Sequence, residues 1–137
     1  MGKYLVTKVV RFCYGHRLMN HAGRCRHLHG HSVRAAVSVS AAGLDSQGMV
    51  CDFADLKAVV AGFVRERFDH NLLLHEDDPL IPLLRDAGER FLALPDHPTA
   101  EVLARLIFEH VQSQGYEVEE VVLWETDSSC AHYRKAN

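Results

Sequence analysis

The chain has 137 residues, of which 47% are hydrophobic and 24% charged, which is the balance of an ordinary globular domain with one core. Its formal net charge of -3 gives no electrostatic reason to expect a nucleic acid partner. The sequence shows neither a basic-then-apolar leader nor an apolar run of membrane-spanning length, and its four scattered cysteines form no C-x-x-C pair. We therefore expect a single domain over residues 1–137, no membrane contact and a reducing, cytoplasmic setting.

Two strands are predicted in the first third of the chain. Residues 4–12 are rich in β-branched and aromatic types, which predicts a strand with His16 at or just past its end. Residues 19–28 show no periodicity and are expected to form a loop. Alternating residue types predict a second strand from about 30 to 42, after which a glycine-containing turn returns the chain.

Two helices with capping residues follow. Asp52 is expected to cap a helix that ends near Arg67 and carries apolar residues at helical spacing. Thr99 is expected to cap a second helix, with Glu101 in its first turn and Gly115 at its end.

The segment between the helices and the end of the chain completes the predicted fold. Residues 75–97 combine an acidic patch with three prolines, which predicts a surface excursion with about two helical turns. Two further strands are expected over 118–126 and 130–134. The order β-β-α-α-β-β predicts an α+β fold, with two main helices on one face of a four-stranded antiparallel sheet.

A histidine cluster at the start of the second strand is the strongest candidate for chemistry. His29 and His31 are two residues apart, so on a strand both imidazoles project from one face, and Gly30 allows close backbone approach. A third imidazole from His16 would complete the three neutral ligands of a catalytic zinc, whose fourth position stays open. The alternative is an H-x-H pair in a loop without metal. A structural zinc site is disfavoured because such sites use four ligands.

Three further residues are candidates for proton transfer. Cys25 lies four residues before His29 in a basic loop, where neighbouring cations favour the thiolate; the alternative is an inert thiol. Asp69 and His70 form a candidate acid–base couple; the alternative is that Asp69 ends the helical region and His70 caps a neighbouring element. The residues assigned to core packing are Phe12, Cys13 and Cys51.

Glu125 ends an otherwise apolar face of the strand 118–126. A buried carboxylate is costly unless it is paired, so Glu125 either turns to solvent or accepts two parallel N–H bonds from a ligand. The amino-pyrimidinone edge of a pterin or guanine offers such a pair of donors. Glu101 has the same ligand-binding interpretation, with a helix-dipole role as the alternative. Three arginines either bind an anion such as triphosphate or are simply solvated, namely Arg17, Arg24 and Arg26.

Six motifs in chain order resemble the 6-pyruvoyl-tetrahydropterin synthase family, and more closely its bacterial 6-carboxy-tetrahydropterin synthase branch. They are Phe12-x-x-x-His16-Arg17-Leu18, Cys25-x-x-x-His29-Gly30-His31, Asp52-Phe53-x-x-Leu56-Lys57, Asp69-His70-x-x-Leu73, Pro98-Thr99-x-Glu101 and Trp124-Glu125-Thr126. The C-x3-H-G-H spacing resembles the carboxy-forming branch, whereas the pyruvoyl-forming enzymes have C-x5-H-G-H. This chain departs from the pattern in its longer 75–97 excursion and in Gly15, which stands where Ala or Ser is usual.

The resemblance implies the tunnelling fold, a homo-oligomer that is usually hexameric, and zinc as the cofactor. The implied metal ligands are His16, His29 and His31. The implied catalytic residues are Cys25 as the base and Asp69 with His70 as an acid–base relay, brought near the cysteine across a subunit boundary. The implied pterin-binding residues are Glu125, Thr99 and Glu101.

The resemblance also implies an activity. The expected reaction is zinc-dependent conversion of 7,8-dihydroneopterin triphosphate to 6-carboxy-5,6,7,8-tetrahydropterin, with loss of triphosphate and acetaldehyde, in 7-deazaguanine (queuosine) biosynthesis. One alternative is the 6-pyruvoyl product or a broader cleavage of pterin side chains. An alternative from another class is a non-catalytic protein that binds zinc or pterin.

Overall fold

Two long antiparallel strands form the centre of the fold. The computed structural model describes residues 2–137, and in it β1 (Tyr4–His16) pairs with β2 (His29–Ala41) along the full length of both strands. Alternation along β1 buries Val10, Phe12 and Tyr14 on one face while the residues between them are more exposed. The first strand was predicted over 4–12, which is too short, because the ladder to β2 continues until His16 lies opposite His29.

The sheet has six strands in the order β4-β3-β1-β2-β5-β6. On the side of β2, β5 (Val118–Thr126) and β6 (Ser129–Arg134) add antiparallel neighbours, as predicted. On the side of β1, β3 (Asn71–His75) and β4 (Leu92–Leu94) add in parallel, so the predicted four-stranded antiparallel sheet is wrong in its strand count and partly in its direction.

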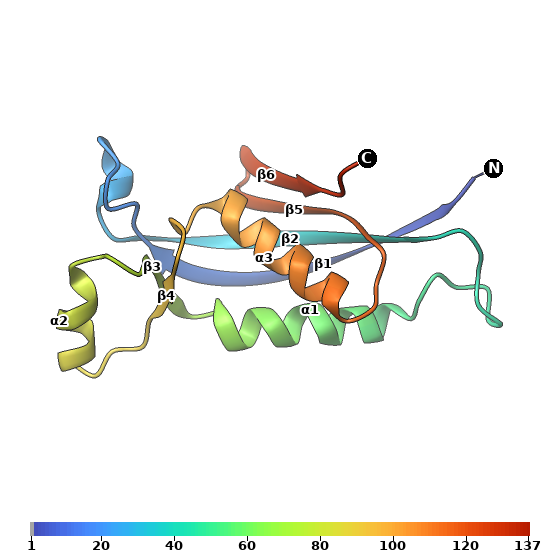
Figure 1. The fold of residues 1–137 in the computed structure, drawn as a ribbon, viewed down its shortest axis with the longest axis horizontal. Helices are drawn as coiled ribbons and strands as arrows, with labels where there is room; N and C mark the ends of the chain where they lie inside the picture. Colours follow the sequence, from blue (N-terminus) through green and yellow to red (C-terminus); the bar gives the residue numbers. More distant parts are fainter. Residues whose placement is uncertain (1) are drawn as a thin grey trace.

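The helices cover one face of this sheet. Helix α1 (Phe53–Arg67) contacts β1, and α3 (Ala100–Ser113) contacts β5 and β6 (Figure 1). Both predicted caps are confirmed: the Asp52 carboxylate accepts from the N–H of Ala54 at 2.8 Å, and the Thr99 hydroxyl accepts from that of Val102 at 3.2 Å. After α3 the chain turns at Gly115, whose φ of 94° favours glycine.

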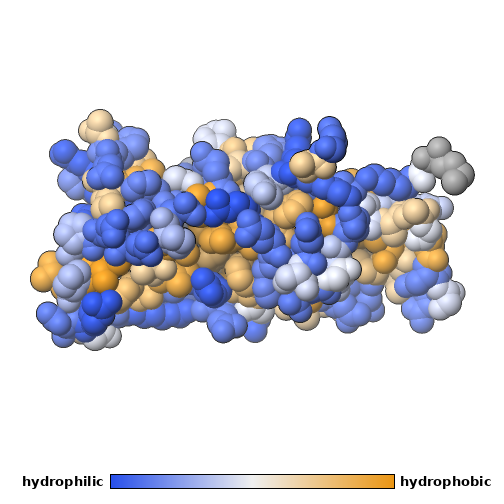
Figure 2. Space-filling view, viewed as in Figure 1, coloured by the Kyte–Doolittle hydropathy of each residue, from blue (hydrophilic) through white to orange (hydrophobic). Residues whose placement is uncertain are grey.

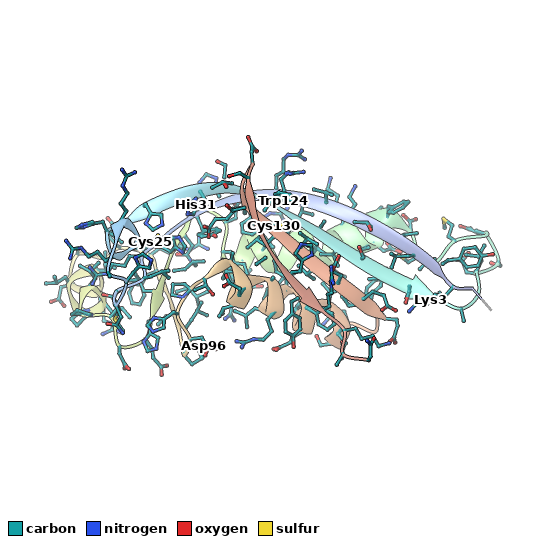
Figure 3. All side chains as sticks on the ribbon, turned by 90° about the horizontal axis from the view of Figure 1, so that it is seen from above. Lys3, Cys25, His31, Asp96, Trp124 and Cys130 are labelled. Atoms are coloured by element: carbon teal, nitrogen blue, oxygen red, sulfur yellow. The ribbon has the colours of Figure 1, made fainter. Side chains whose placement is uncertain are left out.

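The excursion between the helices returns to the sheet. It contains α2 (Leu80–Asp86), which confirms the two expected helical turns, and then β4, which was not expected. The loop between β1 and β2 holds a single 3-10 turn, η1 (Arg24–Arg26). Seen from above, the sheet curves over the helices, and η1 and α2 lie at the same end of the molecule (Figures 1 and 3).

One hydrophobic core fills the space between sheet and helices. Its largest fully buried side chains include Leu56 of α1, Ile107 of α3 and Leu123 of β5. Figure 2 shows that hydrophilic residues cover much of the viewed surface, with hydrophobic residues between them. The α+β class predicted from the sequence is confirmed.

Candidate metal centre

Three imidazoles meet where β1 and β2 end. His16 lies opposite His29, and Tyr14 lies opposite His31, so alternation places all three histidines on the helix-covered face of the sheet. Their ligand atoms lie within 4.8 Å of one another, and the ring centroids are 4.5–5.1 Å apart. The structure therefore brings together the histidines that the sequence indicated as metal ligands.

Main-chain carbonyls fix the orientation of two of the rings. Nδ1 of His16 donates to the carbonyl oxygen of Pro98 at 2.7 Å, and Nδ1 of His29 donates to that of His27 at 2.7 Å. A neutral ring that donates through Nδ1 keeps Nε2 as its lone-pair nitrogen, which is the usual arrangement behind a metal ligand. Pro98 was not singled out as an orienting group from the sequence, because it lies 82 residues further along the chain than His16.

The third ring has a nitrogen that lacks a partner. Nε2 of His31 is the only buried side-chain nitrogen or oxygen among the described residues that has no hydrogen bond. Leaving such an atom unpaired costs about 1–3 kcal/mol, so its position calls for a ligand. Burial of His16, which is 2% exposed, lowers the pKa of its imidazole and favours the neutral form that binds metals. Three imidazoles placed in this way fit zinc with one open position.

Gly30, between the two histidines of β2, lies where the neighbouring strand approaches closely. A Cβ atom at Gly30 would lie 3.1 Å from the carbonyl oxygen of Tyr14 on the neighbouring strand. Because that oxygen belongs to the backbone, a larger residue would push the two strands apart at the level of the cluster.

Glu125 stands beside the histidine cluster. Its carboxylate lies 3.7 Å from Nε2 of His31 and accepts a hydrogen bond from the Tyr14 hydroxyl at 3.4 Å. Burial, reinforced by the charge of Glu125, raises the pKa of Tyr14, so this phenol stays a hydrogen-bond donor. Sequence reasoning placed Glu125 on this face but missed Tyr14, although its two-residue offset from His16 is the signal that could have found it.

Of the other two predicted pterin-binding residues, Glu101 has a free carboxylate side chain whereas the hydroxyl of Thr99 is already hydrogen-bonded. Glu101 and Glu125 together line a small pocket of about 110 Å³ at the start of α3. The hydroxyl of Thr99 is already used as the cap of α3, accepting from the N–H of Val102. Thr99 therefore positions Glu101 on the first turn of α3, while its own side chain is engaged in the cap.

Cys25 sits in η1, on the loop that joins the two histidine-bearing strand ends. The thiol is partly buried, and the carbonyl of Cys25 accepts from the N–H of Leu18 at 2.7 Å, which fixes the loop against the end of β1. Cys25 and His31 lie at the same end of the molecule in Figure 3. Neighbouring Arg24 and Arg26 are exposed.

Arg17 has a different role from either predicted one. Its guanidinium forms a two-point ion pair with Asp78, with distances of 2.8 and 2.5 Å, and Asp78 is 2% exposed. Burial alone raises the pKa of Asp78, but the Arg17 guanidinium and the N–H of Leu80 outweigh burial and hold that pKa below its ordinary value. The Arg17 guanidinium is thus engaged by Asp78, and this pair joins the residues just before α2 to the end of β1.

Asp69 and His70 lie apart from the histidine cluster within one chain. Nε2 of His70 is 4.0 Å from Oδ1 of Asp69, and the same oxygen accepts from the N–H of Cys13 at 3.0 Å. Cys13 alternates with Phe12 and Tyr14, so this group lies on the sheet face that the helices leave open. Phe12 is buried as predicted, but Cys13 is only partly buried, which corrects its assignment to the core.

Among the described residues, the helices are too short or too polar to cross a membrane.

The sequence profile of the family described as 6-pyruvoyl tetrahydropterin synthase matches residues 5–136. A relative from Rickettsia bellii, named 6-carboxy-5,6,7,8-tetrahydropterin synthase, is 34% identical over 127 residues, which cover 88% of this chain and 92% of that protein.

Solved structures agree with the sequence match. An uncharacterized protein from Wolinella succinogenes superposes with a TM-score of 0.82 at 28% identity, covering 99% of this chain and 100% of that one. The 6-pyruvoyl tetrahydropterin synthase of Caenorhabditis elegans, at 22% identity, shares the fold with a TM-score of 0.73 over 99% of this chain and 98% of its own. With a family profile that spans nearly all of its length, the chain belongs to the 6-pyruvoyl tetrahydropterin synthase family.

Proposed function

We propose that the protein is a zinc-dependent lyase that forms 6-carboxy-5,6,7,8-tetrahydropterin. Its substrate is 7,8-dihydroneopterin triphosphate, which with one water yields the product, acetaldehyde and triphosphate, in 7-deazaguanine (queuosine) biosynthesis. The observation that carries this proposal is the unpartnered Nε2 of His31 beside two carbonyl-oriented imidazoles and Glu125. The Rickettsia bellii relative, which bears the name of this activity, supports the choice of product.

The metal would be held by His16, His29 and His31. When bound, zinc supplies a Lewis acid that polarises an oxygen of the substrate side chain and acidifies the neighbouring C–H bond. The carbonyls of Pro98 and His27 keep two of the rings in the tautomer that leaves Nε2 for the metal. Three protein ligands leave a position for the substrate oxygen.

Glu125 would anchor the pterin ring. Its carboxylate can accept the paired N–H donors of the amino-pyrimidinone edge, with Glu101 in the same small pocket as a second acceptor. Glu125 lies 3.7 Å from Nε2 of His31, so a ring held there would be bound next to the metal site.

Proton transfer would use residues from two surfaces. Cys25 removes the acidified proton, since its loop joins the strand ends that carry the metal ligands. Asp69 and His70 return protons to the product. Because they lie on the opposite face of the sheet from the histidine cluster, we propose that a neighbouring copy of the chain supplies them. This requires a homo-oligomer, and we propose a hexamer of single-domain chains that works in the cytoplasm.

The decisive experiment is incubation of the purified protein with 7,8-dihydroneopterin triphosphate, with and without a chelator, and identification of the products by mass. Release of acetaldehyde with a 6-carboxy product supports the proposal, and chelation should abolish it. Retention of all side-chain carbons would instead show the 6-pyruvoyl product. Absence of turnover together with tight pterin binding would show a non-catalytic binder.

A matched pair of cysteine variants tests the proposed base. Cys25→Ala should lose turnover by about 100-fold or more while still binding one metal ion at the histidine cluster. Cys51→Ala, which changes a partly buried thiol outside the proposed site, should keep wild-type turnover. Equal activity in the two variants would remove Cys25 from the mechanism.

A further inference from the structure

We propose that the open face of the sheet carries a second cation site, formed by Cys13, Asp69 and His70. Each residue offers one ligand atom, a thiol sulfur, a carboxylate oxygen and an imidazole nitrogen, and the three atoms lie within 4.8 Å of one another. The group shares no residue with the histidine cluster, and the alternation of Cys13 with Tyr14 puts the two groups on opposite faces of β1.

Backbone hydrogen bonds hold the three ligands in place. The N–H of Cys13 donates to Oδ1 of Asp69 at 3.0 Å, and the N–H of His70 donates to the carbonyl of Cys13 at 2.8 Å. Immediately afterwards Asn71 pairs with Tyr14, where β3 joins β1. Two hydrogen bonds therefore hold Asp69 and the backbone of His70 to Cys13, while the ring of His70 is exposed.

The backbone of His70 is in an unusual conformation. Its φ is 54°, and among the described residues it is the only non-glycine residue in the left-handed region. That region costs about 1–2 kcal/mol for an L-residue, and here it turns the imidazole toward Asp69 and Cys13. Nε2 of His70 already lies 4.0 Å from Oδ1 of Asp69, whereas two ligands of one tetrahedral zinc ion are about 3.4 Å apart.

The donor set selects the kind of ion. A thiolate and an imidazole favour borderline ions such as Zn²⁺ and Co²⁺ over Mg²⁺ or Ca²⁺, which prefer oxygen ligands alone. On binding, the thiolate and the carboxylate contribute two negative charges, which neutralise a divalent ion. The site opens into a hollow of about 670 Å³ that Arg11, Arg34 and Trp124 also line, so a fourth position stays accessible.

An ion bound at this second site would lower the turnover of the proposed enzyme. Where the proposed function holds, an ion on Asp69 and His70 withdraws both from proton transfer, so excess zinc should inhibit and removal of the Cys13 thiol should relieve that inhibition. The site itself is tested without substrate, so a failure of the proposed activity leaves its test intact.

The test is titration of the metal-free protein with Co²⁺, followed by the near-ultraviolet absorption that a thiolate ligand gives to bound cobalt. The wild type should bind two ions per chain and show the thiolate absorption. Cys13→Ser should bind one ion and lose the thiolate absorption. Cys25→Ser, which alters the other cysteine near a metal ligand, should bind two ions and keep it.

A second variant tests the site independently, in case Cys13→Ser does not fold. His70→Asn removes a ligand while keeping a residue that accepts a positive φ, and it should also bind one ion. Circular dichroism confirms that each variant is folded. Binding of one ion by the wild type, binding of two by Cys13→Ser, or loss of the thiolate absorption in Cys25→Ser alone would overturn the proposal.

Discussion

His31 gives the sharpest expectation at the scale of single residues, because its Nε2 is buried without a partner. Replacing it with Leu removes an unpaired polar atom, so apo His31→Leu should unfold at no lower urea concentration than the apo wild type. The variant should lose the zinc-dependent gain in stability, which for one site is about 4 kcal/mol when zinc is 1,000-fold above its dissociation constant.

This measurement is best made in a Cys13→Ser background, so that a second ion does not contribute. His21→Leu, on the exposed loop between β1 and β2, serves as the control and should keep the full stabilisation by zinc. A His31→Leu protein that zinc stabilises as strongly as its parent would remove His31 from the metal site.

His16 makes the stability of the apo protein depend on pH. Burial lowers its pKa in the folded state below the ordinary value of 6.5, so the unfolded chain binds the proton more readily. Above 6.5 the ring contributes no pH dependence, and below it the folded state should lose stability as the pH falls. Urea unfolding across this range should show a shallower pH dependence for His16→Asn, which keeps a donor for the Pro98 carbonyl, than for the wild type.

The sequence indicated the histidine cluster more readily than the groups that orient it. The H-x-H spacing and the C-x3-H-G-H string point to His29, His31 and Cys25 as candidates through local chain geometry alone. The carbonyl of Pro98 and the Tyr14 hydroxyl became visible only in three dimensions, since their partners lie 82 and 111 residues away along the chain. Cys13 was assigned to the core because one strand residue does not reveal which face the helices will cover.

At the scale of elements, the ion pair between Arg17 and Asp78 joins α2 to the end of β1. Removing one member of a buried pair leaves the other charge unpaired, so Asp78→Asn should destabilise the fold by about 3 kcal/mol in urea unfolding. The double variant Arg17→Met with Asp78→Asn, which keeps an acceptor for the N–H of Leu80, should recover much of that loss. A double variant as unstable as Asp78→Asn would show that charge pairing is not what holds this junction.

The elements that the sequence predicted well are those with long periodic patterns. Helices α1 and α3 and strands β2 and β5 carry enough residues for their periodicity to be read, and capping residues mark the helix starts. Strand β3 has five residues and β4 has three, and both pair in parallel with segments distant in the chain. No local pattern distinguishes such short apolar runs from loops.

At the scale of the whole molecule, Asp69 and His70 fall on the sheet face opposite the histidine cluster of the same chain. We expect Cys25→Ala and His70→Ala to be inactive alone but to regain activity when their subunits are exchanged at equal amounts. Random assembly should restore up to about one quarter of the wild-type sites, those that draw both intact residues from different chains. The measurement is turnover before and after exchange.

Size-exclusion chromatography should show assemblies of equal size throughout, which separates lost catalysis from lost assembly. An exchanged mixture that forms intact assemblies without regaining turnover would place Cys25 and His70 in the same site of a single chain.

The hydrogen bond from His16 to Pro98 also makes the histidine cluster depend on a later part of the chain. The two residues are 82 positions apart, so an emerging polypeptide that ends before Pro98 has the histidines but not the carbonyl that orients the first of them. The oriented histidine cluster is therefore complete only after the fold has closed.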